Sequence, residues 1–552
     1  MFKRTEVALI FASAACFFSA GEAWAQPASL GSVSNASQAV IQVSWTQGLG
    51  AKIDQTLSAG TSGLVGKRFS AQDLAGMLQS LTDRLRQAGY LVGQVGIRPA
   101  DLQQFQSSGV LLLTVLPGKV GAVRVTDNQS LVNSERLQIT ALHAVCPEGV
   151  GDNCVLTSDR LERMVLLLQD LPGLKPHVPS LTPEGVAPGQ TAIEIGADTD
   201  PNARLFSGGV SVNDFGYPAS GLYQAGVTGV LTNGLGFGDV LSIAANVSEK
   251  GTWTGSFGAS APIGYDGLRF DTSYARSQFT LPSVTSVGKA DSVLAGLVYP
   301  MVRGLDGNWN LGLDGFWSKS HQSVTGFSAF ASRTLYGGRI SLLGDSGDRS
   351  FTAGADFWSA SLVYSHGWVE QDLGGVTDPT GVIGNYDKVL LNATAREYLA
   401  DNNFYLLANL RGQYADRNLD GSEKFSIGGP TGIRGYRGDE GSMDEFGVLT
   451  LELRRMFDLS DGDKLAPGVL FDLGGGDYVH HTYASWQSNL GFLDTTLPNS
   501  RAFESAGLGI DYHANTGAIL SFSWSHALPG SPVSLNHPSD ENQFWFSGGI
   551  QF

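Results

Sequence analysis

Across residues 200–552, apolar side chains recur at every second position, and this alternation restricts the possible folds more than any other feature of the chain. An early face with this period consists of Tyr223, Ala225, Val227, Gly229 and Leu231. The final segment, 543–552, places Phe544, Phe546, Ile550 and Phe552 on one side. A period of two is typical of β-strands that separate an apolar from a polar environment. The pattern predicts many antiparallel strands joined by turns.

The composition agrees with a strand-rich chain and excludes one class of partner. Of the 552 residues, 72 are glycine, and charged residues make up only 16%. Such proportions are typical neither of disordered segments nor of helical membrane proteins. The formal net charge is −17, and no basic stripe is visible in the sequence, so nucleic acid is not expected as a partner.

The N-terminus has the features of a secretory signal peptide, expected over residues 1–25. Lys3 and Arg4 precede an apolar stretch, and Ala23-Trp24-Ala25 provides a cleavage site. A short arm, residues 26–37, follows. Beyond it no apolar run reaches the roughly 18 residues of a membrane-spanning helix. An exported membrane protein without such helices is expected to be a transmembrane β-barrel.

The length of the alternating region sets the expected size of this barrel. At roughly 10 residues per strand plus turns, residues 200–552 accommodate about 16 strands, and 14 to 18 would also fit. The barrel is therefore expected to occupy residues 200–552.

Two similar units precede the barrel, at residues 38–118 and 119–199. Each is expected to fold as strand, helix, helix, strand, strand, the βααββ order of a small α/β domain. In the first unit, Ser70 and Asp73 predict a capping box, and Gly89 predicts the end of that helix. In the second, Thr157 is expected to begin a helix that stops before Pro172.

Cysteine usage predicts one disulfide. Cys16 lies in the expected signal peptide and would leave with it, whereas Cys146 and Cys154 remain in an oxidising compartment. We expect these two to be bonded. Two free buried thiols are the alternative.

Residues 425–447, FSIGGPTGIRGYRGDEGSMDEFG, interrupt the alternation with glycine, charge and turn residues. Clean strands flank this segment on both sides. Downstream, one face is apolar, and the other carries Thr450, Glu452 and Arg454. The segment is therefore expected to be a long loop between two strands.

The block Ile433-Arg434-Gly435-Tyr436 resembles the [VI]-R-G-[YF] signature of outer-membrane protein-transport barrels. That superfamily includes the TpsB transporters of two-partner secretion, of the haemolysin and filamentous-haemagglutinin type, and the BAM-type assembly factors. The units 38–118 and 119–199 resemble its POTRA domains. An ordinary charged loop with a chance RGY, and a pair of plain spacer domains, are the alternatives.

The resemblance implies roles for individual residues. The loop motif, with Arg437 and Gly438 added, would anchor or gate a loop folded back into the barrel. Its arginine would pair with an aspartate of an F-x-D-x-G-like motif on a neighbouring strand. Residues 468–474, GVLFDLG, supply Asp472, although this aspartate directly follows Phe471 and the spacing departs from the motif. A forked guanidinium is well suited to holding a carboxylate.

For function, the resemblance implies an outer-membrane transporter with its POTRA domains in the periplasm. These would capture a large unfolded TpsA-type partner, which would cross the barrel and fold outside. Besides this partner and the membrane lipids, the barrel assembly machinery would recognise Phe552. No cofactor, metal or enzymatic activity is expected. An assembly factor of the BAM type, a passive porin and an enzymatic barrel are the other possibilities, in that order.

Two short motifs could suggest other chemistry. Gly344-Asp345-Ser346-Gly347 resembles a serine-protease nucleophile segment, but without a histidine base in context we interpret it as a turn. His480-His481 follows the Asp472 strand; such neighbours point apart on a strand, and no third metal ligand is evident. We interpret the pair as part of a surface loop.

Overall fold

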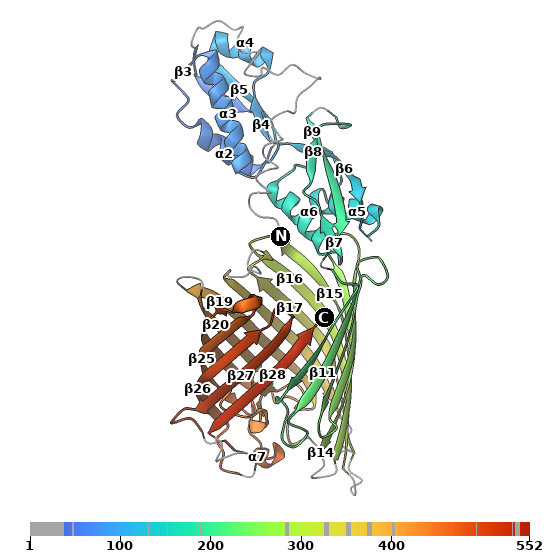
Figure 1. The fold of residues 1–552 in the computed structure, drawn as a ribbon. Coiled ribbons are helices and arrows are strands. Elements are labelled where there is room, and N and C mark those ends of the chain that lie inside the picture. The colour runs from blue at the N-terminus through green and yellow to red at the C-terminus, as the bar shows by residue number, and fades with distance from the viewer. Residues whose placement is uncertain are drawn as a thin grey trace. The chain divides into compact units, whose positions relative to one another are not determined.

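The computed structural model divides into two compact units, with the boundary between Ala203 and Arg204 (Figure 1). The expected signal peptide and arm, residues 1–37, lie outside the described residues. The structure describes residues 38–46, 49–130, 132–151, 153–187, 189–201, 203–281, 286–324, 330–348, 355–371, 378–399, 403–492, 494–532, 534–535 and 541–552.

The first described residues form a small α/β fold in which β5 lies at the centre of a three-stranded sheet. β5 is parallel to β2 and antiparallel to β4, while β1 and β3 form a separate pair. The elements are β1 (Gln38–Ala39), β2 (Gln42–Trp45), α2 (Ala51–Thr61), β3 (Arg68–Phe69), α3 (Ala71–Gln87), β4 (Gln94–Gly96), α4 (Pro99–Ser108) and β5 (Val110–Leu116).

Helix α3 has the ends that its sequence predicts. The Ser70 side chain accepts a hydrogen bond from the Asp73 amide, and the Asp73 side chain accepts one from the Ser70 amide. Gly89 follows the helix with φ +101°, a conformation that glycine adopts without strain. The capping box is therefore confirmed.

Helix α4 is an addition to the expected order of elements. It begins with Pro99, a favourable first helical residue, and ends at Gly109, whose φ is +71°. Among its ten residues, its buried apolar residues are Leu102 and Phe105. One pair at i, i+3 is too short a repeat to stand out in the sequence.

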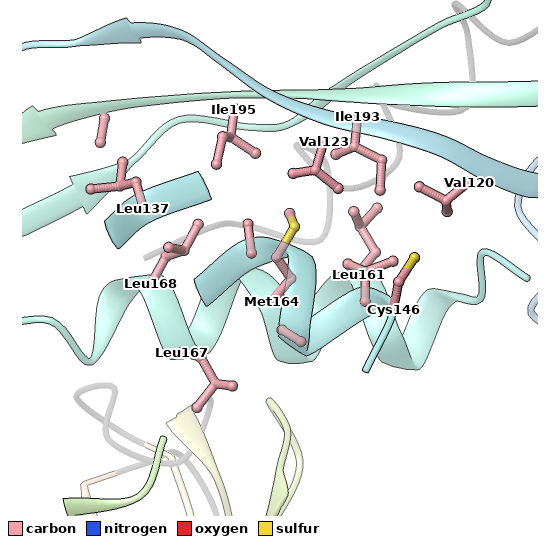
Figure 2. Packing of buried hydrophobic residues seen from close by; sticks show 14 of the residues in the cluster. Val120, Val123, Leu137, Cys146, Leu161, Met164, Leu167, Leu168, Ile193 and Ile195 are labelled. Atoms are coloured by element: carbon pink, nitrogen blue, oxygen red, sulfur yellow. The ribbon is translucent and has the colours of Figure 1, made fainter. Parts of the chain in front are cut away.

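The next fold places two helices against one face of a sheet centred on β9. β6 runs parallel to β9, and β7 and β8 each run antiparallel to it. The elements are β6 (Lys119–Asn128), α5 (Ser134–Val145), α6 (Ser158–Gln169), β7 (Leu174–Pro176), β8 (Ser180–Thr182) and β9 (Gln190–Thr199). The side chains shown in Figure 2 fill the space between sheet and helices, among them Val120, Val123, Leu137, Leu161, Met164, Leu168, Ile193 and Ile195.

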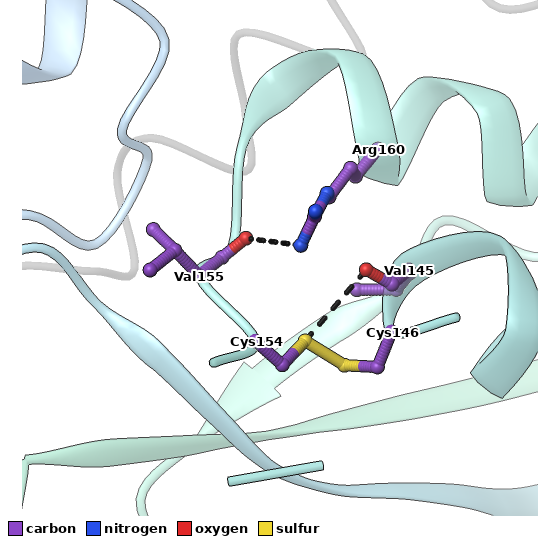
Figure 3. Close-up of a disulfide and its surroundings, with 5 residues drawn as sticks. All are labelled: Val145, Cys146, Cys154, Val155 and Arg160. Carbon is purple, nitrogen blue, oxygen red and sulfur yellow. Dashed lines mark hydrogen bonds between the residues drawn. A yellow bond between two sulfur atoms is a disulfide. The ribbon is translucent and has the colours of Figure 1, made fainter. Parts of the chain in front are cut away.

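A disulfide joins Cys146, at the end of α5, to Cys154 (Figure 3). The two Cα atoms are 5.3 Å apart, and both residues are buried in the same core. The loop that the disulfide closes lies along β6, because the Val120 amide donates to the Cys154 carbonyl at 2.9 Å and the Gly151 amide donates to the Val120 carbonyl at 3.0 Å. The disulfide thus holds a cover over the start of this edge strand.

The second unit is a closed antiparallel barrel. Each strand pairs with its neighbours in the chain, and β10 pairs with β28 to close the ring. The strands are β10 (Phe206–Asn213), β11 (Gln224–Thr232), β12 (Val240–Ser248), β13 (Trp253–Pro262), β14 (Arg269–Leu281), β15 (Ser286–Arg303), β16 (Asn308–Val324), β17 (Phe330–Asp345), β18 (Phe357–Glu370), β19 (Gly384–Leu399), β20 (Phe404–Ala415), β23 (Glu445–Arg455), β24 (Phe457–Asp458), β25 (Lys464–Asp477), β26 (Ser500–His513), β27 (Ala518–Ala527) and β28 (Asn542–Gln551).

The ring has 16 strands, because β24 continues β23 beyond Met456 and both pair with β25. This agrees with the expected barrel. We call the end where β10 begins and β28 ends the proximal end, and the opposite end the distal end. The long connections 416–444, 478–499 and 528–541 all lie at the distal end.

The alternation of the sequence separates the two faces of the wall. On β25, Val469 and Leu473 are exposed on the outside, whereas Leu470 and Asp472 between them are buried inside. On β23, Leu453 is exposed and Glu452 is buried. On these strands the outer face is therefore apolar, as a lipid-facing surface requires, and the polar residues face the lumen.

None of the helices in the described ranges is long and apolar enough to cross a membrane.

Two connections at the distal end pack against the inner face of the wall. The segments 416–444 and 478–499 contribute β21 (Phe425–Ser426), η6 (Gly438–Glu440), β22 (Ser442–Met443) and α7 (Trp486–Asn489). Their apolar side chains form a core with inward residues of the wall, comprising Phe425, Ile427, Ile433, Tyr436, Met443, Phe446, Val448, Tyr478, Val479, Trp486, Phe492, Leu497 and Phe503.

Candidate functional site

The segment between β20 and β23, which we call the lumen loop (residues 416–444), contains the Arg434 motif. Its tip is held by its own backbone: the Ile433 amide donates to Ile427 O at 3.0 Å, and the Gly429 amide donates to Tyr436 O at 2.9 Å. The loop ends at Asp444 and not at Gly447, because Glu445 already pairs with Asp477 in the barrel. The tip is therefore a compact, hydrogen-bonded unit.

Arg434 lies buried against the inner wall and binds two carboxylates. Its Nη2 is 2.6 Å from Asp472 Oδ1, and its Nε is 3.1 Å from both oxygens of Asp472. Its Nη1 forms a further ion pair with Glu452. Burial by itself would lower the pKa of Arg434, but the two carboxylates raise this pKa above its ordinary value. The guanidinium stays charged, and the structure brings the expected residues Arg434 and Asp472 together.

Strand register places these carboxylates side by side. Asp472 on β25 lies opposite Thr450 on β23 and opposite Ser505 on β26. Glu452 is two residues from Thr450 and therefore shares its inward face. Ser505 Oγ donates to Asp472 Oδ2 at 2.8 Å, and Arg434 N donates to the same oxygen at 2.9 Å. Asp472 is thus fully hydrogen-bonded, as a buried carboxylate needs to be.

The charge network continues toward the proximal end. Arg454 Nε is 2.6 Å from Glu452 Oε2, and Arg454 Nη1 is 2.7 Å from Asp511 Oδ2. Glu452 is consequently shared between two arginines. It retains a positive partner even if Arg434 moves away.

Gly435 allows the tip to approach the wall closely. Its amide donates to Ser505 Oγ at 3.1 Å. A Cβ at this position would lie 2.6 Å from the Ser505 Cβ and 3.1 Å from the Ala527 amide nitrogen. On the other side, Trp545 Nε1 donates to the Arg434 carbonyl at 2.9 Å. Only glycine fits this contact without moving the loop.

Tyr436 adds an apolar contact and one polar bond. Its ring lies edge-on to Phe503, with centroids 5.0 Å apart. Its hydroxyl donates to Pro532 O at 2.7 Å. Burial raises the pKa of Tyr436 to about 12, so the hydroxyl keeps its proton at neutral pH. The side chain joins the loop to the connection 528–541.

The remaining motif residues attach the returning part of the loop. Arg437 Nε donates to Gln543 Oε1 on β28 at 3.2 Å, and the Gly438 carbonyl accepts from Ser426 Oγ at 3.4 Å. Glu440 is fully buried and accepts hydrogen bonds from Ser534 Oγ at 2.6 Å and the Leu535 amide at 3.1 Å.

The first part of the lumen loop is attached to other strands. Arg333 on β17 binds Asp420 at 2.6 Å, and Lys388 on β19 forms an ion pair with Glu423. Lys424 and Asp444 form a buried pair at 2.6 Å that closes the base of the loop.

The contacts at the two ends of the lumen loop lie on opposite sides of the barrel. β17, which holds the start of the loop through Arg333, is the eighth strand of the ring, and β28, which holds Arg437, is the sixteenth. Strands eight places apart in a ring of 16 lie on opposite sides. The loop therefore spans the lumen between opposite walls.

Several partners of the loop belong to no recognisable sequence motif. In the sequence, Glu452 stands out only as part of a polar strand face, and no local pattern marks Ser505, Trp545 or Glu440 as a partner of the loop. Trp545 is 111 residues from Arg434 along the chain. Only strand register and barrel closure show that these residues meet.

The histidine pair lies in the connection after β25, in agreement with its interpretation as part of a loop. His480 and His481 have ring centroids 4.3 Å apart, because they lie in a turn after β25 where side chains do not alternate. His480 Nδ1 contacts Glu445 Oε1. Among the described residues, no group of three or more potential ligands could hold a metal ion.

The chain matches known families over both of its units. Residues 189–491 match the family described as haemolysin secretion/activation protein ShlB/FhaC/HecB, and residues 47–118 match the ShlB-type POTRA domain. The heme/hemopexin transporter protein HuxB of Haemophilus influenzae is 24% identical over 512 residues, covering 88% of this chain and 81% of HuxB. The outer membrane transporter CdiB of Dickeya dadantii is 24% identical over 397 residues, covering 70% of this chain and 66% of CdiB.

Solved structures share the fold. CdiB from Escherichia coli superposes with a TM-score of 0.70 at 17% identity, covering 99% of this chain and 96% of CdiB. BamA from Haemophilus ducreyi lacking POTRA domains 1–3 gives a TM-score of 0.51 at 16% identity, covering 94% of this chain and 100% of that chain. At these identities the likeness concerns the architecture of barrel and POTRA domain.

Proposed function

The chain belongs to the haemolysin secretion/activation family ShlB/FhaC/HecB and is an outer-membrane transporter of two-partner secretion, and from this premise we propose that the lumen loop is the movable barrier of its transport path. The proximal end of the barrel is its periplasmic end. A polypeptide crossing from there to the outside must pass the loop.

The observation that carries this proposal is the attachment of Arg434 inside the lumen. Its guanidinium lies buried between Asp472 and Glu452. Two other contacts of the loop, Arg333 with Asp420 and Arg437 with Gln543, lie on opposite walls of the barrel. A buried ion pair has a large desolvation cost, which offsets much of its attraction, so its contribution to net stability is small. Its main effect here is to hold the loop in one defined position. Such a contact is suited to a loop with two states, held or released.

We propose that the N-terminal domains supply the polypeptide. In the first sheet, whose order is β2-β5-β4, both outer strands have one side without a strand partner within the described residues. An extended segment of a client can add to such an edge through main-chain hydrogen bonds. In the second sheet the disulfide-closed loop covers the start of β6, which leaves less of that edge accessible.

The partner that fits this path is a large secreted protein of the TpsA type, exported unfolded. Two similar proteins carry the names heme/hemopexin transporter HuxB and outer membrane transporter CdiB. For this chain we therefore propose a dedicated protein client, with no enzymatic step.

The end of the chain closes the barrel. The Phe552 amide donates to Gly208 O at 2.9 Å, and the Gly208 amide donates to Phe552 O at 3.0 Å. We propose that the barrel assembly machinery recognises this last strand before the ring closes.

The experiment compares secreted and outer-membrane proteins of wild-type cells and of a deletion strain, with the deletion complemented by the wild-type gene as control. We expect one large protein to disappear from the medium while the membrane profile stays unchanged. A broad loss of barrel proteins would instead assign the chain to membrane-protein assembly. No change in either fraction would leave no client and refute dedicated secretion.

A further inference from the structure

Basic side chains gather on three neighbouring strands near the distal end of the barrel. On β14, Arg276 lies opposite Asp291 of β15, which in turn lies opposite Lys319 of β16. In the next row of the same face, Lys289 lies opposite His321. Residues directly opposite each other in a sheet point to the same side, so these side chains form one patch. We call Arg276, Lys289, Lys319 and His321 the basic patch.

The basic patch faces the membrane and not the lumen. Val293 and Trp317, which alternate in phase with Lys289 and Lys319, are exposed large apolar residues of the outer surface. Phe316, in the opposite phase, is buried in a lumen cluster and lies under Arg339. The patch therefore continues the lipid-facing surface.

Its position along the strands is that of a membrane interface. Tyr274 on β14 and Trp317 on β16 are exposed aromatic residues, and the next outward residues toward the distal end are Arg276 and Lys319. Aromatic girdles mark the boundary between lipid tails and headgroups in such barrels. β14 is the fifth strand from the periplasmic start, so this end of it points outward from the cell. The basic patch thus lies at headgroup level of the outer leaflet.

The charges of the patch are arranged for an anion. Asp291 accepts a hydrogen bond from the Tyr274 hydroxyl at 2.6 Å and lies 3.6 Å from Arg276 Nη1. Asp291 thus positions Arg276, while the ammonium groups of Lys289 and Lys319 add two further positive charges. Arg276, Lys289 and Lys319 are all exposed, within a chain whose net charge is −17.

The patch is local. Farther round the ring, the outward residues at the corresponding ends of β18 and β19 include Glu370 and Asp387, which are acidic. An anionic ligand is therefore favoured on β14–β16 and disfavoured on β18–β19.

We propose that the basic patch binds the phosphate groups of a phosphorylated glycolipid of the outer leaflet, with its acyl chains against Val293 and Trp317. Arginine and lysine are the usual phosphate-binding side chains, and the apolar surface beside them suits the tails. This lipid site is separate from the transport path through the lumen.

The test is native mass spectrometry of the full-length protein in detergent, titrated with lipid A carrying two, one or no phosphates. We expect affinity to fall in that order. Each basic residue near an anionic headgroup contributes about fivefold in affinity, so the variant R276Q/K289Q/K319Q should bind the diphosphorylated form roughly a hundredfold more weakly. The matched control E370Q/D387N should bind at least as well as the wild type.

Three outcomes would overturn the proposal. Equal binding of all three lipid A forms by the wild-type protein would show that phosphate is not recognised, and this result does not depend on any variant folding. Competition by equimolar inorganic phosphate would indicate a site for the free anion. Loss of binding in chelator would indicate a metal bridge to acidic residues in place of direct contact with the basic patch.

Discussion

Replacing Arg434 by alanine removes the guanidinium but leaves the other attachments of the tip. Breaking a buried ion pair from one side costs about 3–5 kcal/mol, mainly because the remaining charge is buried without a counter-charge. In this variant Asp472 still accepts hydrogen bonds from Ser505 Oγ and from the backbone amide of residue 434, and Glu452 still forms an ion pair with Arg454. We therefore expect the lower end, about 3 kcal/mol, or roughly a hundredfold shift toward the released loop.

Hydrogen–deuterium exchange of the purified barrel measures this shift directly. The amides of Ile433 and Gly435 are hydrogen-bonded in the held loop, at 3.0 Å and 3.1 Å, and should exchange roughly a hundredfold faster in R434A. The barrel itself should remain heat-modifiable, while secretion of the client falls severely. Lysine at position 434 should rescue only in part, because its single ammonium cannot bind in the forked geometry.

The matched control is Lys464, whose pair with Asp458 is exposed and 3.9 Å long. Such surface pairs contribute about 0–1 kcal/mol, so K464A should leave both exchange and secretion unchanged. Wild-type exchange rates at the tip of R434A would refute the reasoning, because the buried pair would then not hold the loop. Normal secretion with fast exchange would remove the loop from the transport mechanism.

Three further predictions concern other contacts. G435A should release the tip much as R434A does, because the new Cβ would lie 2.6 Å from the Ser505 Cβ, whereas G447A, with nothing within 4 Å, should behave as wild type in the same exchange experiment. Burial raises the pKa of Glu440, so the held loop binds a proton more tightly than the released one. Protection of the tip against exchange should therefore decrease as pH rises from the ordinary carboxyl pKa through the raised value. In E440Q the protection should not change with pH over that range. Removing the disulfide by C146S/C154S should lower the free energy of unfolding of the N-terminal unit by about 2–3 kcal/mol, measured by urea unfolding of the full-length protein, and an unchanged midpoint would contradict this.

The strands of the barrel wall could be predicted from the sequence because the alternation that marks them is local. Barrel strands repeat apolar and polar residues with period two, as in Leu449 to Leu453, and this repeat does not depend on which strand lies next to it. The capping box at Ser70 was equally local. Helix α4, with one buried apolar pair, was too weakly periodic to be found.

The residues that hold the loop also divide into those with a local sequence signal and those without one. Arg434 and its neighbours form a contiguous motif, and Asp472 came from its place in a second motif, so both could be named beforehand. Ser505 and Trp545 could not, because neither belongs to a motif and each meets the loop only through strand register and closure of the ring. The sequence by itself determined the barrel, the N-terminal domains and the arginine that anchors the loop. Only the tertiary structure decided what that anchor touches and where the basic patch assembles, because those contacts join positions far apart along the chain.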